Sequence, residues 1–263
     1  MFLSNLDQEL TKEYLNQGYV IRPVANVRAL KWIQNQIIRL ICDALDYQNY
    51  EEPEIFLNTI HTKIGIEKLN EFRLLIIRNL NSIDEFSENY FSIARPYLEA
   101  LVGNELAMQL RVNLSIQLPN DSSSLLPVHA DTWSGDSPFE VVVWIPLVDC
   151  YRTKSLYLLP PQKYADLCSD FSVKAGGSSE SLYQSIKQDV NWLDIKCGEV
   201  LVFDQSLPHG NRINEEDETR WSMNCRFKGV FTPYGDKKIG EFFAPITLRA
   251  ASKCGMDYKL PKI

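Results

Sequence analysis

The spacing of apolar residues divides the chain into two parts. Up to about residue 106, apolar side chains recur at intervals of three and four, which is typical of helices. The pattern predicts helices over residues 7–17, 27–45, 66–80 and 87–101, with a short strand over residues 19–21. Gly18 is a residue type that ends helices, Asn26 can cap the second helix, and Pro96 would interrupt or bend the last one.

From about residue 107 the period falls to two, which is typical of strands. Residues 110–118 and 219–232 alternate between apolar and polar side chains, whereas residues 139–147 are rich in β-branched and aromatic side chains and predict a strand buried on both faces. Residues 156–159 predict a short strand. Residues 193–195 and 200–204 predict a hairpin around the turn at residues 196–199.

These elements predict a single domain that is mainly β, with a helical N-terminal region over residues 1–106 packed on a core over residues 107–235. Many short antiparallel strands separated by turns are typical of a sandwich or barrel, of which the jelly roll is one form. Residues 162–191 form a polar, helix-containing insertion, and residues 236–263 form a C-terminal extension. Gly176-Gly177 in the insertion could belong to a lid over a site, but a tolerated surface loop is the favoured interpretation.

Composition narrows the functional classes. The chain has 263 residues, of which 45% are hydrophobic and 23% are charged, as in ordinary globular proteins. A formal net charge of −7 argues against a nucleic-acid or anionic-membrane surface. We find no apolar run long enough to span a membrane and no signal-peptide pattern. The six cysteines show no C-x-x-C pair, which indicates reduced thiols and a cytoplasmic location.

Two short segments carry side chains that could bind one metal ion. His129 and Asp131 lie two residues apart, and residues i and i+2 of an extended strand point to the same face. His209 follows 78 residues after Asp131 (209 minus 131) and would supply a second imidazole. Two histidines and one carboxylate leave further metal positions open, as in non-haem Fe(II) oxygenases. Each segment could instead be a surface turn or a loop histidine, and His61 is interpreted as a surface residue.

Open metal positions would suit a chelating 2-oxo acid and dioxygen, and the far carboxylate of a dicarboxylic oxo acid would then need a cation. Arg220 lies 11 residues after His209 (220 minus 209), and a guanidinium can hold a carboxylate through two parallel hydrogen bonds. Gln117 could donate to the same oxo acid or to a metal-bound water. Even-numbered residues of the predicted strand share one face, which carries Arg220, Ser222, Asn224 and Arg226. The two arginines could instead face water or pair with the acidic residues 215–218.

Five motifs follow one another in a fixed order along the second half of the chain. They are His129-x-Asp131, Ser-Leu-Tyr-Leu-Leu-Pro at residues 155–160, Gly-Glu-Val-Leu-Val-Phe-Asp at residues 198–204, His209-Gly210-Asn211, and Arg220. This order resembles the Fe(II)/2-oxoglutarate-dependent dioxygenase superfamily. It is most similar to the phytanoyl-CoA-hydroxylase-like branch and to oxygenases of bacterial carbohydrate-biosynthesis clusters.

The resemblance implies a double-stranded β-helix (jelly-roll) core flanked by helices. It implies Fe(II) bound by His129, Asp131 and His209, with 2-oxoglutarate held at Arg220 and with Arg226 and Ser222 as further contacts. The implied reaction uses O2, converts 2-oxoglutarate to succinate and hydroxylates a small molecule, carbohydrate-related metabolites included. Because Asp131 is retained, the halogenase variant of the family is disfavoured.

Some features depart from the family pattern or leave alternatives open. Relatives often carry Pro-Gly-Ser-His where this chain has Pro160-Pro161-Gln162-Lys163, so any substrate role of that histidine does not carry over. Trp133 either lines the substrate space or packs a loop, whereas Trp144 and Trp221 are interpreted as core residues. Two other functions stay open: a cupin-like metalloenzyme that uses no 2-oxoglutarate, and a catalytically silent jelly-roll binding module.

Overall fold

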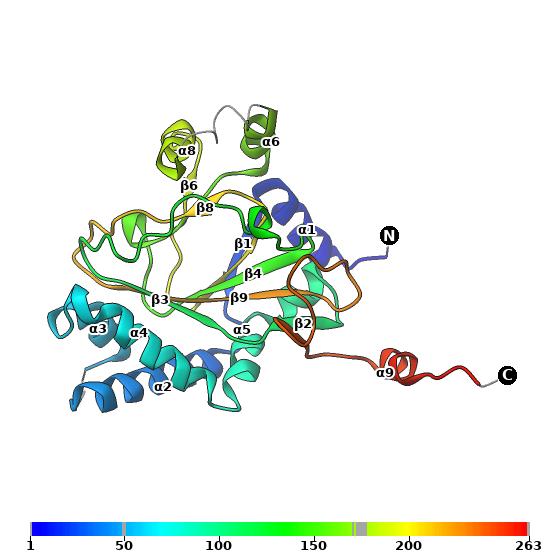
Figure 1. Cartoon of the computed structure of the whole chain (residues 1–263), viewed down its shortest axis with the longest axis horizontal. Coiled ribbons are helices and arrows are strands. Elements are labelled where there is room, and N and C mark those ends of the chain that lie inside the picture. The colour runs from blue at the N-terminus through cyan, green and yellow to red at the C-terminus, as the bar shows by residue number, and fades with distance from the viewer. Residues whose placement is uncertain (1, 49–50, 170, 172–177, 262–263) are drawn as a thin grey trace.

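A computed structural model describes residues 2–48, 51–169, 171 and 178–261, and Figure 1 shows its layered arrangement. The N-terminal region contains α1 (Asn5–Gln17), β1 (Tyr19–Pro23), α2 (Val27–Leu45), α3 (Pro53–Asn58), the 3-10 helix η1 (Ile60–Thr62), α4 (Ile66–Asn81) and α5 (Phe86–Leu101). The strands that follow are β2 (Leu106–Gln109), β3 (Asn113–Gln117), β4 (Glu140–Pro146), β5 (Tyr157–Leu158), β6 (Asn191–Trp192), β7 (Glu199–Asp204), β8 (His209–Gly210), β9 (Arg220–Gly229) and β10 (Phe243–Pro245). Helices α6 (Pro161–Ser169), α8 (Ser179–Ile186) and α9 (Ala250–Asp257) complete the chain, with short 3-10 turns at η2 (Asp131–Ser134) and η3 (Arg152–Lys154).

Two antiparallel sheets form the centre of the described structure. The larger has the order β1-β7-β4-β9-β2-β10, and β3 pairs with β9 beside β2. The smaller has the order β6-β5-β8. Strand β4 is buried along its whole length, because β7 and β9 flank it in the sheet and other layers cover both of its faces. This continuous burial explains the apolar run predicted as a two-faced strand.

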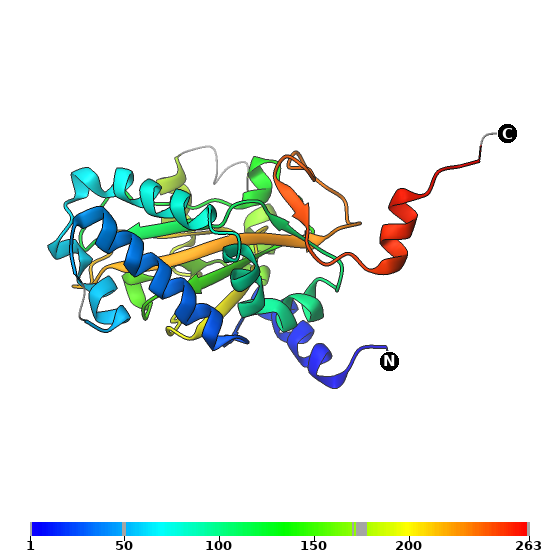
Figure 2. The same cartoon turned by 90° about the horizontal axis from the view of Figure 1, so that it is seen from below.

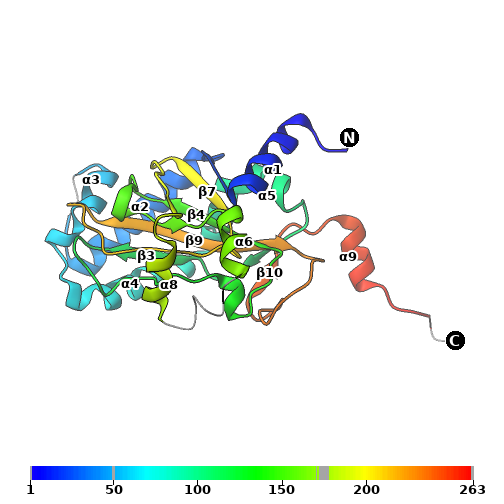
Figure 3. The same ribbon diagram turned by 90° about the horizontal axis from the view of Figure 1, so that it is seen from above.

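Helices α2, α4 and α5 cover the outer face of the large sheet, while α6 and α8 lie on the side of the small sheet (Figures 2 and 3). Polar anchors link these layers in addition to apolar packing. The Tyr90 hydroxyl on α5 donates to the Val143 carbonyl of β4 over 2.8 Å, and the Gln34 amide on α2 donates to the Leu147 carbonyl over 3.0 Å. The helical region is thereby fixed to the strand layer that carries the candidate site.

Most sequence predictions of element type are confirmed. The helices over the N-terminal region lie where they are predicted, and α5 continues through Pro96 as one helix. Trp221 and Trp144 are core residues, and all six cysteines are free. No described helix is long and apolar enough to cross a membrane. The Gly176-Gly177 pair lies outside the described residues.

The predicted hairpin over residues 193–204 is wrong. Strand β6 ends at Trp192 and pairs with β5 in the small sheet, whereas β7 pairs with β1 and β4 in the large sheet. Ile195 makes only an isolated bridge to Cys150. The turn at residues 196–199 therefore carries the chain from one sheet to the other. Short-range alternation could not distinguish this crossover from a hairpin, because both have strand-like residues on either side of a glycine turn.

Gly18, at the C-terminal end of helix α1, packs against the segment that leads to His209, one of the candidate metal ligands. It caps α1 in the left-handed conformation, with φ +81°, and its amide donates to the Tyr14 carbonyl. A Cβ atom at this position would lie 2.1 Å from Cδ1 of Leu207, two residues before His209. Glycine is therefore required here both by its backbone conformation and by close packing.

We predict that Gly18→Ala lowers the free energy of unfolding by about 1–3 kcal/mol, because alanine is strained at positive φ and Leu207 must move. Thermal denaturation should show a fall of several degrees in Tm. Gly255→Ala on α9, where an added Cβ meets nothing within 4 Å, is the matched control and should leave Tm unchanged or slightly higher. Equal Tm values for the wild type and Gly18→Ala would contradict the assigned constraint.

Candidate metal centre

His129 and His209 are paired through their backbones. The His129 amide donates to the His209 carbonyl over 3.0 Å, and the His209 amide donates to the His129 carbonyl over 2.8 Å. Residues that exchange both hydrogen bonds in an antiparallel pair project their side chains to the same face. The two imidazole rings accordingly lie side by side, with 4.3 Å between their centroids.

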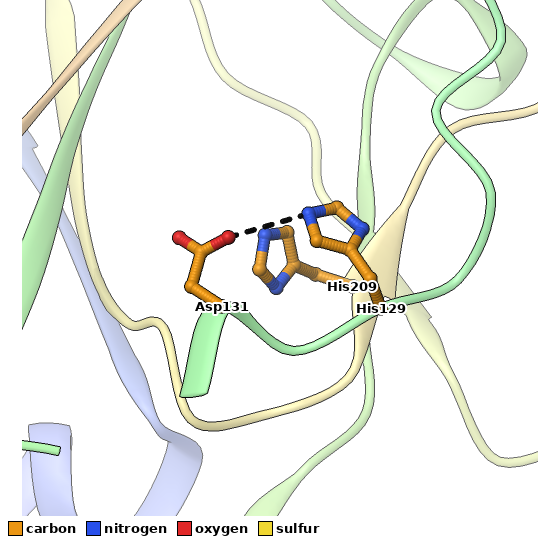
Figure 4. Close-up of side chains that lie close together, drawn as sticks. All are labelled: His129, Asp131 and His209. Atoms are coloured by element: carbon orange, nitrogen blue, oxygen red, sulfur yellow. Dashed lines mark ion pairs between the residues drawn. The ribbon is translucent and has the colours of Figure 1, made fainter. Parts of the chain in front are cut away.

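Asp131 joins the two histidines because the chain is extended at Ala130, with φ −121° and ψ 136°. Residues 129 and 131 therefore share a face even though they do not belong to a regular strand, and Asp131 is the first residue of η2. Its amide donates to the Gln205 carbonyl over 3.0 Å, which holds this turn against the end of β7. Ligand atoms of all three residues lie within 4.8 Å of one another (Figure 4).

Backbone carbonyls set the tautomer of both rings. Nδ1 of His129 lies 2.9 Å from the Pro127 carbonyl, and Nδ1 of His209 lies 2.8 Å from the Leu207 carbonyl. A carbonyl oxygen only accepts, so each Nδ1 carries the proton and each Nε2 presents a lone pair. Burial, and to a smaller degree the neighbouring His129, lowers the pKa of His209 to about 4, so this ring is neutral at pH 7.

The free nitrogen of His129 faces a carboxylate rather than a hydrogen-bond donor. Its Nε2 lies 3.5 Å from Oδ1 of Asp131, as the dashed line in Figure 4 marks. Both atoms are lone-pair donors when His129 is neutral, so a cation between them would stabilise this approach. Two imidazole nitrogens and one carboxylate oxygen fit a first-row divalent metal, and they are the three residues predicted from the sequence.

The other oxygen of Asp131 is held by Arg226. Nη2 of Arg226 lies 2.7 Å and Nε lies 3.0 Å from Oδ2 of Asp131, and both side chains are largely buried. Burial opposes ionisation of this carboxyl, but its contact with His129 and the charge of Arg226 hold the pKa of Asp131 well below its ordinary value. Arg226 Nε also donates to Oε1 of Gln205 over 3.0 Å. Asp131 is thus fixed so that Oδ1 remains directed at the histidines.

A cavity of about 490 Å³ opens beside the three candidate ligands. The even-numbered face of β9 lines it with Arg220, Ser222, Asn224 and Arg226, the stripe that the alternation predicts. Further lining comes from β3, from the loop at residues 123–126 and from helix α4. The structure therefore brings the predicted arginine stripe and the predicted ligands into one space.

Arg220 lies in this cavity without an anionic partner among the described residues. Its side chain is 4% exposed, Nη1 donates to the Ser155 carbonyl over 3.0 Å, and Nη2 donates to Oγ of Ser115 over 2.8 Å. Nε of Arg220 and Oγ of Ser222 are buried and have no hydrogen-bond partner in the described part of the chain. Burial lowers the pKa of Arg220 to about 10, so the guanidinium is still charged at neutral pH.

The remaining predicted residues lie at the edge of the site or outside it. The Gln117 amide donates to the Arg212 carbonyl over 2.7 Å, and this side chain does not line the cavity. Trp133 is 38% exposed and packs on Phe171, with 5.0 Å between ring centroids. His61 is half-buried, lies 3.0 Å from the Thr219 hydroxyl and does not line the cavity.

The acidic residues 215–218 do not neutralise the arginines of the stripe. Glu218 binds the buried Lys154, and Glu216 lies 3.8 Å from Arg152. Sequence reasoning also missed several residues that shape the site: Ser115, Gln205, Asn70 and Arg73. The period-two pattern could have suggested Ser115, which shares a face with Gln117. Nothing in the pattern of α4 indicates which of its polar residues face the cavity.

We predict that Arg226→Met weakens binding of Ni(II) by roughly tenfold or more, because a carboxylate ligand that loses its supporting hydrogen bonds loses its orientation. Isothermal titration of the metal-free protein would measure this, and Arg226→Lys should give an intermediate affinity because it keeps the charge without the two-pronged contact. Unchanged or tighter binding in Arg226→Met would mean that charge repulsion between the guanidinium and the ion outweighs the orientation of Asp131.

No protein-family model matches the chain, and no curated protein matches it in sequence. Among solved structures, the non-haem monooxygenase ThoJ in its nickel complex is similar, with a TM-score of 0.57 and 13% identity over 92% of this chain and 85% of that one. HygX from Streptomyces hygroscopicus, with nickel and 2-oxoglutarate bound, has a TM-score of 0.52 and 14% identity over 88% and 89% of the two chains.

The non-haem, α-ketoglutarate-dependent epimerase SnoN from nogalamycin biosynthesis has a TM-score of 0.51 and 15% identity over 89% and 87% of the two chains. At these identities the likeness shows the fold alone, and placement in the phytanoyl-CoA-hydroxylase-like branch stays a prediction. The predicted fold class is confirmed: this chain has the helix-flanked jelly-roll fold seen in non-haem, 2-oxoglutarate-dependent enzymes.

Proposed function

We propose that this protein is an Fe(II)- and 2-oxoglutarate-dependent dioxygenase that hydroxylates a small molecule. One observation carries the proposal: a His-Asp-His group lines the same cavity as a buried arginine that has no anionic partner among the residues the structure describes. The His-Asp-His group alone would suit many metalloenzymes. The buried arginine adds a site for a carboxylate, and a dicarboxylic oxo acid has a carboxylate to place there.

His129, Asp131 and His209 would hold the metal through Nε2, Oδ1 and Nε2. When bound, Fe(II) would supply the open positions at which a 2-oxo acid chelates and O2 is activated. The protein contributes preoriented imidazoles whose Nε2 atoms can face the metal, because the Pro127 and Leu207 carbonyls accept the Nδ1 protons. Arg226 keeps the Asp131 carboxylate ionised and oriented.

Arg220 is the residue best suited to the distal carboxylate of 2-oxoglutarate. A buried guanidinium without an anion costs several kcal/mol, and a carboxylate would supply both a charge and acceptors for Nε. Ser222 lies on the same face of β9, and its buried hydroxyl could donate to the same carboxylate. Arg226 is less suited to this role because its guanidinium already binds Asp131. We assign Gln117 no direct contact with the oxo acid.

The size and lining of the cavity support a small-molecule substrate. About 490 Å³ is ample for a metabolite beside a cosubstrate, and the walls mix apolar residues with a few polar groups. Two of the similar solved structures are enzymes of nogalamycin biosynthesis, which supports a small-molecule metabolite as the substrate class. Carbohydrate-related substrates belong to this class, and hydroxylation is the outcome we propose.

We predict that anaerobic addition of Fe(II) and 2-oxoglutarate produces a metal-to-ligand charge-transfer band in the visible spectrum. His129→Ala should lose the band and any succinate release, because one of three ligands is removed. His61→Ala is the matched control, since that histidine binds Thr219 outside the cavity and should keep the band. A folded wild type without a band would contradict the proposal and favour a metalloenzyme that uses no oxo acid.

We predict that Arg220→Met weakens 2-oxoglutarate binding by about a hundredfold, as expected for a lost charge-assisted pair of hydrogen bonds. Without ligands, the variant should unfold at a Tm no lower than that of the wild type, because the uncompensated buried charge is gone. Titration calorimetry on Ni(II)-loaded protein and thermal denaturation would measure both effects. Wild-type affinity for 2-oxoglutarate in Arg220→Met would contradict the assigned role and support a function without that cosubstrate.

A further inference from the structure

Helix α4 contributes a third arginine, Arg73, to the cavity lining. In the proposed function Arg73 contacts neither the metal nor 2-oxoglutarate. Arg73 and Asn70 line the cavity from this helix, beside the apolar side chains of Leu69 and Leu114. Asn70 is exposed and Arg73 is half-buried, so this wall is accessible from solvent. Arg73 belongs to a different wall from the β9 stripe, because α4 packs against β3, the strand that pairs with β9.

Arg73 has hydrogen bonds but no ion pair in the described part of the chain. Nη2 donates to Oδ1 of Asn70 over 2.8 Å, and Nη1 lies 3.4 Å from the Leu114 carbonyl. On a helix, residues three or four positions away are the neighbours that could neutralise it. Those positions are Leu69, Asn70, Ile76 and Ile77, none of which is acidic. Two neutral acceptors orient the guanidinium and leave its charge and its other N–H groups available.

The charges of the cavity leave room for a second anion. Of the described residues that line it, three are arginines and one is a carboxylate, Asp131, although the chain as a whole has a net charge of −7. A divalent metal with three arginines brings five positive charges, whereas Asp131 and a dicarboxylate bring three negative ones. Two positive charges therefore remain after the cosubstrate is bound. A cavity walled by low-dielectric protein strengthens the attraction of this excess for an anionic ligand.

We propose that Arg73, with Asn70, forms a subsite for an oxyanion on the primary substrate, either a carboxylate or a phosphate. The proposal rests on the proposed function, since it assigns Arg220 to 2-oxoglutarate and Arg73 to the molecule that is oxidised. The guanidinium binds the anion through paired N–H groups, while the Asn70 amide is free to donate its own hydrogens. Leu69 and Leu114 flank the subsite and favour an apolar carbon skeleton beside the charged group.

The test uses three probes of similar shape: phenyl phosphate, phenylacetate and the neutral phenylacetamide. Each is titrated calorimetrically into full-length protein loaded with Ni(II) alone and with Ni(II) plus 2-oxoglutarate. We expect at least one anionic probe to bind the wild type more tightly than phenylacetamide, in both loaded forms. Preference between the two anions identifies the oxyanion as phosphate or carboxylate.

Arg73→Met should weaken binding of the preferred anion by about tenfold or more, which is the loss expected for one charge-assisted interaction. Arg73→Lys should recover part of it, because it keeps the charge. Arg78→Met is the matched control: Arg78 lies on the same helix, is exposed and does not line the cavity, so binding should be unchanged.

Three outcomes would overturn the subsite: the anions bind Arg73→Met as they bind the wild type, the neutral probe binds equally well, or neither anion binds the wild type. A fourth is that Arg73→Met weakens 2-oxoglutarate itself, which would assign Arg73 to the cosubstrate. Failure of the proposed function has a different signature, because wild-type protein would then bind no 2-oxoglutarate while the titrations with Ni(II) alone still report on Arg73.

Discussion

His129 and His209 exchange both of their backbone hydrogen bonds across 80 residues of sequence (209 minus 129). This contact fixes the segment around His129 against strand β8 and so sets the relative position of the two histidines. Because the two residues form a bonded antiparallel pair, their imidazoles must project to one side. The extended backbone at Ala130 then directs Asp131 to the same side. The site therefore depends on main-chain geometry, and the side chains need little freedom to converge.

Carbonyl groups and one arginine complete this arrangement. The Pro127 and Leu207 carbonyls hold the Nδ1 protons, so both histidines present Nε2. Arg226 occupies one oxygen of Asp131 and leaves the other directed at the rings. The packing of Leu207 against Gly18 extends this support to the N-terminal helix α1. Helices and strands far apart in sequence thus contribute to the position of each ligand.

The sequence predicts those parts of the site that local periodicity determines. His-x-Asp in an extended segment, and the even-numbered stripe on β9, both follow from the side-chain period of a strand. The sequence cannot reveal that Arg226 binds Asp131, because that pair depends on how β9 passes the turn after Ala130. The sequence likewise does not show that Arg73 lines the cavity or that Gln205 contacts Arg226, because both depend on how distant elements pack together. The false hairpin over residues 193–204 arose because alternation identifies strands without saying which sheet they join.

In the proposed function, three side chains from two distant segments bind one metal ion. The most direct measurement is anomalous X-ray diffraction at the nickel absorption edge, from crystals grown with Ni(II) and 2-oxoglutarate. We expect one strong peak in contact with Nε2 of His129, Nε2 of His209 and Oδ1 of Asp131. A peak elsewhere in the molecule, or none near these three atoms at saturating Ni(II), would contradict it.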